Sequence, residues 1–111
     1  MILVVIESPL AGDVGLNIGY AKACMRDSLA RGEAPYASHL LFAQPGILDD
    51  SDPTDRERGI EAGFAWGEAA DLRAVYVDLG ISGGMYRGIA EAARLGQTVE
   101  LRMLGPEWRK P

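Results

Sequence analysis

The sequence is short of cysteine, histidine and positive charge, and each shortage excludes a class of protein. One cysteine, Cys24, cannot form a disulfide within the chain, which excludes a small secreted scaffold held by disulfides. One histidine, His39, and one thiol cannot make a zinc site of the usual Cys/His kind. Sixteen Asp and Glu against eleven Lys and Arg leave a net charge of −5, which argues against duplex nucleic acid as a partner.

The sequence also has no long apolar run. The longest one, residues 1–6, stops at Glu7 and has no basic leader, so it resembles neither a signal peptide nor a membrane span. We therefore expect no membrane partner and a cytoplasmic protein. We also expect no metal and no cofactor, because no dinucleotide fingerprint and no phosphate-loop lysine is present.

Strand and helix patterns alternate along the 111 residues. Strands are expected at residues 2–6, 34–38, 74–77 and 98–103, and helices at about 14–31, 53–70 and 85–95, with an irregular segment at 39–54. This alternation predicts an α/β fold, a small flavodoxin-like or Rossmann-like parallel sheet of about four strands in the order 2-1-3-4, with helices on both faces. One domain spans residues 1–104, and residues 105–111 form a tail.

Ligands of such sheets bind beyond the carboxyl ends of the strands, at the switch point between strands one and three. Three loops are expected at that edge, at residues 8–13, 39–52 and 78–84. The candidate ligand-binding residues are therefore Ser8, Pro9, Asp13, His39, Gln44, Asp78, Gly80, Ser82, Gly83, Gly84 and Met85.

Each of these loops also has a purely structural interpretation. The glycine-rich loop from Gly80 to Gly84 could bind an anion at a helix N-terminus, or it could be a tight turn. Asp78 could hold a ribose hydroxyl or cap a turn, and Asp13 is also the best cap for the first helix. His39 could contact a ligand or move a proton, or it could bond a loop carbonyl.

Three glycines recur every four residues on the second predicted helix, at Gly59, Gly63 and Gly67. Glycine costs about 1 kcal/mol in a helix relative to alanine, so this stripe indicates close approach to another backbone. That backbone belongs either to the sheet or to a second subunit. Phe64 and Trp66 flank the stripe and favour a homo-oligomer, with core packing inside one chain as the alternative.

Several stretches of the chain resemble a known family. The strand and turn from Ile2 to Pro9, and the segment from Asp78 to Val99, are similar to the nucleoside 2-deoxyribosyltransferase superfamily. With residues 21–35, 38–41 and 44–46 they resemble more closely a set of small, largely phage-encoded proteins of unknown function related to that superfamily. The similarity extends to about Leu104. It implies a nucleoside or nucleotide-like ligand and, for a phage protein, the host cytoplasm.

The chain departs from this superfamily at one position. In the transferases a glutamate on the third helix attacks the anomeric carbon, and the matching residue here is Gly88, which has no side chain. The nearest carboxylate on that helix is Glu91, about one turn later. The transferases also carry an acid that handles the base, on the loop where Asp78 and Ser82 lie. The resemblance thus implies a pocket without its nucleophile.

Three hypotheses for the function follow. The favoured one is binding of a nucleoside, nucleotide or related ribosyl ligand without glycosyl transfer, for instance by a phage protein that sequesters a nucleotide signal. The second is an enzyme acting on an N-glycosidic bond, a deoxyribosyltransferase or an N-glycosidase, with Asp78 and Glu91, or Glu7, as catalytic residues. The third is a protein-interaction module anchored by Trp66 or Trp108. A homo-oligomer would close a pocket that a four-stranded sheet leaves shallow.

Overall fold

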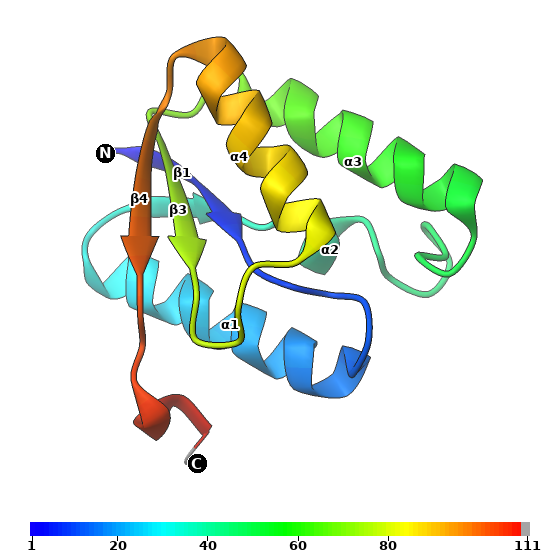
Figure 1. Cartoon of the computed structure of the whole chain (residues 1–111), viewed down its shortest axis with the longest axis horizontal. Coiled ribbons are helices and arrows are strands. Elements are labelled where there is room, and N and C mark those ends of the chain that lie inside the picture. The colour runs from blue at the N-terminus through cyan, green and yellow to red at the C-terminus, as the bar shows by residue number, and fades with distance from the viewer. Residues whose placement is uncertain (110–111) are drawn as a thin grey trace.

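A four-stranded parallel sheet lies between two layers of helices in the computed structural model, which describes residues 1–109 (Figure 1). The elements in chain order are β1 (Leu3–Glu7), α1 (Val14–Ala30), β2 (Ala34–Tyr36), α2 (Ser38–Leu41), α3 (Pro53–Gly67), β3 (Leu72–Tyr76), α4 (Gly83–Leu95), β4 (Thr98–Arg102) and the short 3-10 helix η1 (Pro106–Arg109). The strand order is β2-β1-β3-β4 and each pair is parallel. The predicted α/β fold and its strand order are confirmed.

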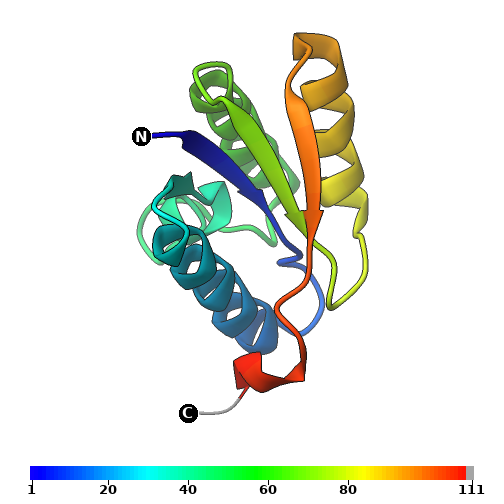
Figure 2. The same ribbon diagram turned by 90° about the vertical axis from the view of Figure 1, so that its left-hand side faces the viewer.

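Helix α1 covers one face of the sheet, and α3 and α4 cover the other (Figure 2). Alternate strand residues point to opposite faces, so each strand contributes to two cores. The core on the α1 face consists of Val4, Ile6, Tyr20, Cys24, Ala37, Leu72, Ala74 and Tyr76. This core holds the end of β1 rigidly beneath the loops that follow the strands.

The core on the second face contains a buried arginine. Arg73 of β3 is 1% exposed and lies with Val5 and Val75 beneath α3 and α4. The two helices are joined at the surface by a bidentate ion pair, in which Arg87 donates to Glu57 over 3.0 and 2.8 Å. This face therefore combines apolar packing with a buried charge that needs a partner.

The glycine stripe of α3 packs inside the chain. A Cβ at Gly63 would lie 2.9 Å from the Cβ of Ser38 on α2, and one at Gly67 would lie 3.0 Å from Nη2 of Arg73. The close approach predicted from the spacing is therefore made to α2 and to the sheet. Of the two flanking aromatic residues, Trp66 is 66% exposed.

Several predicted boundaries move. The second strand ends at Tyr36, because Ser38 already begins α2 inside the segment expected to be irregular. The third strand begins at Leu72, two residues before the predicted start at Ala74. Arg73 can lie inside the sheet because it forms an ion pair with Glu7. Helix α3 ends at Gly67, three residues before the predicted end at Ala70. No helix within residues 1–109 is long and apolar enough to cross a membrane.

The end of the chain folds back onto α1. The ring of Trp108 in η1 packs edge-on against Tyr20, with ring centroids 4.9 Å apart. The part of the predicted tail from Gly105 to Arg109 is thus attached to its own domain, whereas Lys110 and Pro111 lie outside the described residues.

Candidate functional site

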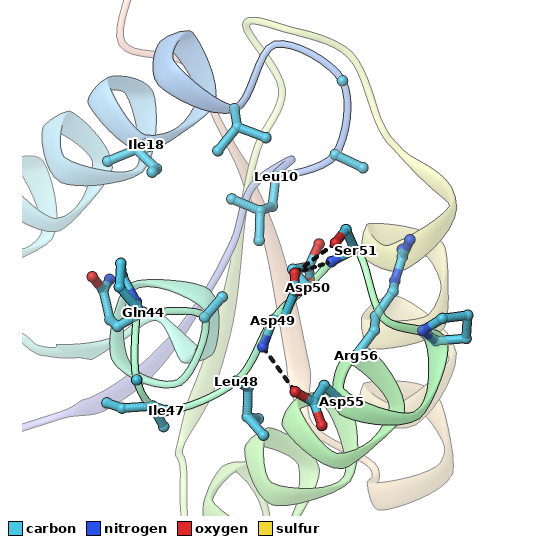
Figure 3. Close-up of a pocket in the computed structure, with 17 residues that line it drawn as sticks. Leu10, Ile18, Gln44, Ile47, Leu48, Asp49, Asp50, Ser51, Asp55 and Arg56 are labelled. Atoms are coloured by element: carbon cyan, nitrogen blue, oxygen red, sulfur yellow. Dashed lines mark hydrogen bonds between the residues drawn. The ribbon is translucent and has the colours of Figure 1, made fainter.

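An open pocket of about 890 Å³ lies beyond the carboxyl end of β1 (Figure 3). Its walls come from the β1–α1 loop, the start of α1, the segment 43–51 and the start of α3. Leu10 and Ile18 form one apolar side, and Ile47 and Leu48 lie across from them. This volume is within the range of pockets that bind small molecules, and the position is the edge where parallel sheets bind ligands.

Local hydrogen bonds hold the first wall of the pocket, which consists of the β1–α1 loop and the start of α1. Asn17 is buried in α1, and its Nδ2 donates to the carbonyl oxygens of Leu10 and Ala11 over 2.9 and 3.0 Å. Asp13 accepts from the backbone N–H of Leu16 over 3.1 Å and so caps α1. The sequence left two roles open for Asp13, ligand binding and capping of the first helix. In the structure Asp13 caps the helix.

The second wall, the segment 43–51, is held by its own side chains. Asp49 accepts from the N–H and the hydroxyl of Ser51 over 3.0 and 2.6 Å, and these bonds hold the pKa of Asp49 below its ordinary value. The N–H of Asp49 donates to Asp55 over 2.9 Å. Gln44, a predicted site residue, lines the pocket and donates to the carbonyl of Leu40 over 2.7 Å.

Two charged side chains of the pocket take no part in these hydrogen bonds. Asp50 and Arg56 line it, and the side chain of neither has a hydrogen bond or ion pair with any other residue that the structure describes. Arg56 extends toward the start of α4, where a Cβ at Gly84 would lie 3.6 Å from its Nη2 (Figure 3). The pocket thus presents one unpaired carboxylate and one unpaired guanidinium.

A side cavity of about 60 Å³ adjoins the pocket and shares Leu48, Asp50 and Arg56 with it. His39 of α2 lines this side cavity, and its Nε2 lies 3.0 Å from the hydroxyl of Ser8. Burial lowers the pKa of His39 below its ordinary value, while the charge of Asp50 opposes that shift. The ring is therefore neutral at pH 7, and Ser8 fixes its orientation.

The residue before Ser8 is a buried acid. Nη1 of Arg73 donates to Glu7 over 2.8 Å, and the side chains are 1% and 14% exposed. Burial raises the pKa of Glu7 to about 7, against the lowering effect of Arg73. A Cβ at Gly88 of α4 would overlap the carboxylate of Glu7. A strongly raised pKa makes an acid a candidate for chemistry, and Glu7 itself lies behind the site, since it lines neither the pocket nor the side cavity.

The two predicted catalytic acids have other partners. Asp78 accepts from the hydroxyl of Tyr20 over 2.6 Å and from the N–H groups of Leu104 and Gly105, each over about 3.0 Å. Burial alone would raise its pKa, but these hydrogen bonds hold the pKa below its ordinary value. Glu91 accepts from Arg94 on α4, and the Glu91 side chain is 10% exposed. Neither acid lines the pocket or the side cavity.

The glycine-rich loop forms the start of α4. Ser82 caps the helix, with the N–H of Met85 donating to its hydroxyl over 3.3 Å, and Met85 is 1% exposed in the core. Gly80 has a φ of +85°, the conformation that its turn requires. Of this loop, Gly84 approaches the pocket through Arg56, while Gly80, Ser82, Gly83 and Met85 do not line it.

The structure therefore brings together only part of the predicted site. Gln44 and His39 line the cavities, Ser8 contacts His39, and the buried Pro9 lies next to it in the chain. Sequence reasoning missed Asp50, although it stands in a run of polar residues inside a predicted ligand loop. It also missed Asn17, whose signal was a polar residue one turn from Ala21 on the buried side of a helix.

The walls of the pocket combine apolar side chains with one unpaired carboxylate and one unpaired guanidinium. Within residues 1–109, no group of three His, Cys, Asp or Glu side chains is arranged to hold a metal ion. A search of curated proteins found no match to this chain. A family model matches residues 2–102, which include all four strands. The chain belongs to this family, DUF7768, which is described as a domain of unknown function.

Proposed function

We propose that the chain binds a nucleoside or nucleotide-like ribosyl ligand in the open pocket, without glycosyl transfer. The observation that carries this proposal is the pocket of about 890 Å³ with apolar walls and two unpaired, opposite charges. The base would pack against Leu10, Ile18 and Leu48, as flat rings do in apolar sites. Asp50 would accept hydrogen bonds from the ligand, and Arg56 would pair with a phosphate.

The charges of the pocket limit how many phosphates the ligand carries. Asp49, Asp50 and Asp55 line it against one cation, Arg56. Like charges repel across a partly desolvated pocket, so a triphosphate is disfavoured. The proposed ligand is a nucleoside or a nucleoside monophosphate.

The kinship with the nucleoside 2-deoxyribosyltransferase superfamily, and with its phage-encoded relatives, is part of this proposal. Its support is the confirmed strand order and the position of the pocket at the sheet edge where that resemblance places a ligand. A phage protein of this kind, in the host cytoplasm, would remove a nucleotide signal from the host or adjust a nucleotide pool by holding one member.

The proposal is tested by depletion and recovery. The protein is dialysed against nucleosides, 5′-monophosphates, cyclic nucleotides and ADP-ribose-type compounds, then denatured by heat, and the released compounds are analysed. We expect depletion of a nucleoside or monophosphate and its unchanged return. Arg56→Gln should weaken monophosphate binding about tenfold and leave nucleoside binding unchanged. Arg58→Gln, on the same helix but outside the pocket, is the matched control. Depletion of no compound would refute the proposal.

A second candidate function is cleavage of the N-glycosidic bond. The observation that favours it is the carboxylate of Glu7, which fills the space beside Gly88 and has a pKa raised to about 7. Such an acid can donate or accept a proton near neutral pH. In the same experiment, cleavage would release free base in place of intact ligand, and Glu7→Gln would abolish that release. A Glu7→Gln protein that still releases base would exclude Glu7 from this reaction.

The homo-oligomer remains a prediction. The glycine stripe that first favoured it is occupied by Ser38 and Arg73 of the same chain, so its support is now the shallow, open pocket and the exposed Trp66. Sedimentation velocity across a range of concentrations tests it, and a monomer at every concentration would refute it.

A further inference from the structure

The side cavity lies beside the main pocket of the proposed site. It holds about 60 Å³, which is room for about two water-sized groups and too little for a ring system. It opens next to the main pocket, because the two share Leu48, Asp50 and Arg56. A ring bound in the main pocket can therefore reach this cavity only with a substituent.

The polar groups of the cavity decide which substituent fits. Asp50 has no hydrogen-bond partner among the residues that the structure describes, and a carboxylate only accepts hydrogen bonds. His39 uses Nε2 for Ser8, so Nδ1 is the ring nitrogen left for a ligand. Phe42 and Ile60 line the same cavity and offer no side-chain hydrogen bond.

Asp55, Ser38 and Arg56 also line the cavity. The hydroxyl of Ser38 lies 3.1 Å from a Cβ at Gly63, and Nη2 of Arg56 lies 3.6 Å from a Cβ at Gly84, so both donors have positions against α3 and α4. A group that only accepts, such as a carbonyl oxygen, would face the carboxylates of Asp50 and Asp55, whereas an amino group can donate to them.

We propose that the side cavity selects ligands that carry an exocyclic amino group on their ring, which Asp50 binds beside His39. This inference rests on the proposed function, since it names the class of base that the same pocket takes. Bases with an amino group in place of a carbonyl, as in adenosine and cytidine, are bound in preference to inosine and uridine.

Ser8 is a positioning residue in this arrangement. It is 7% exposed and follows the last residue of β1, so its hydroxyl is held by the sheet. The 3.0 Å contact transmits that fixed position to His39, which stands on a helix of only four residues. Asp50 lies on the irregular wall and lines the same side cavity as His39.

Matched nucleoside pairs test the selection on the unmodified protein. Affinities are measured by calorimetry for adenosine against inosine and for cytidine against uridine. We expect the amino member of the better-bound pair to bind at least tenfold more tightly. N6,N6-dimethyladenosine keeps the ring and loses both N–H donors, so it should bind no better than inosine.

Two variants then assign the selection to Asp50. Asp50→Asn replaces an acceptor with a group that both donates and accepts, so the preference should fall to about twofold or less. Glu61→Gln removes the same charge from the exposed side of α3, outside both cavities, and it should keep the preference. Circular dichroism confirms that both variants are folded.

The outcomes separate this inference from the function on which it rests. Equal affinity within each pair, or a preference for the carbonyl member, would overturn the selection while leaving nucleoside binding intact. A strong preference for ribosides over 2′-deoxyribosides without discrimination between bases would place a sugar hydroxyl in the cavity, and would also overturn it. Binding of no nucleoside and no monophosphate would overturn both.

Discussion

The carboxylate of Glu7 lies against Gly88, in the volume that any side chain at position 88 would need. Glu7 ends β1 and Gly88 lies within α4, so residues from opposite ends of the chain share one space. Arg73 holds the carboxylate there through an ion pair. The lack of a side chain at position 88 is thus a condition for the buried pair, and the two positions depend on each other.

Replacing this glycine should destabilise the fold. Gly88→Ala would push the Glu7 carboxylate away from Arg73, which is 1% exposed and would be left without its charge partner. We expect a net loss of about 2 kcal/mol in urea unfolding, after a gain of about 1 kcal/mol in helix propensity. Gly19→Ala is the control, because open space surrounds it on α1, and it should stabilise. A Gly88→Ala protein as stable as the wild type would contradict this reading.

Glu7 should also give the protein an unusual dependence on pH. Its pKa is about 7 in the folded chain against an ordinary value of 4.5, because burial outweighs Arg73. Between these values the folded chain keeps a proton that the unfolded chain has released, so the stability falls as the pH rises through this window. The contribution of Glu7 is about 3 kcal/mol.

Urea unfolding at pH 4.5 and 7.5 measures this effect, with Glu7→Gln as the comparison. The glutamine cannot ionise, so the variant should lack that decline, and its unfolding free energy relative to wild type should rise from pH 4.5 to pH 7.5. An identical pH dependence in the two proteins would show that Glu7 titrates normally.

Asp78 should contribute to the stability of the fold and not to ligand binding. Its carboxylate accepts from Tyr20, Leu104 and Gly105, which tie the chain end to α1 and β3. Asp78→Asn should cost about 2 kcal/mol of unfolding free energy and leave the ligand affinity of the folded protein unchanged. Glu91→Gln keeps an acceptor for Arg94 at a side chain that is 10% exposed, and its effect should be smaller, about 1 kcal/mol. Loss of ligand binding in a folded Asp78→Asn protein would contradict this and would show that Asp78 contributes to the site.

His39 should titrate below its ordinary pKa of 6.5, because burial disfavours the charged ring. The chain has one histidine, so a single set of imidazole signals follows the titration by NMR. As the pH falls below 6.5, the unfolded chain takes up a proton before the folded one, and the stability falls. The same titration in 8 M urea supplies the reference, about 6.5. A folded midpoint at or above that reference would contradict the burial of the ring.

The fold was predictable because its signals are local. The apolar run ending at Ile6 marked the first strand, and the capping residue Asp13 marked the start of α1. The position of Arg73 was not predictable in this way. A charged residue inside a strand indicates an exposed position, and only its pairing with Glu7, far away in sequence, makes it a core residue.

The site was predictable in location and not in composition. The pocket lies at two of the three loops predicted from the sequence, 8–13 and 39–52, since parallel strands place the loops that follow them at one edge, whereas loop 78–84 does not line it. Which residues face the pocket depends on tertiary hydrogen bonds. Asp78 is turned to Tyr20 and Asp49 to Ser51, while Asp50 is left unpaired among described residues. Nothing in the sequence distinguishes these three aspartates.

The wall formed by residues 43–51 contributes no residue to the buried core of either face. The buried core lies in the strands and in the helices packed on them. About half of the residues that line the pocket belong to the irregular segment 43–51. On the function proposed above, a substitution in this one short stretch is expected to change the ligand while folding stays intact. Segment 43–51 is therefore the stretch to compare between relatives that share the sheet once the ligand of one of them is known.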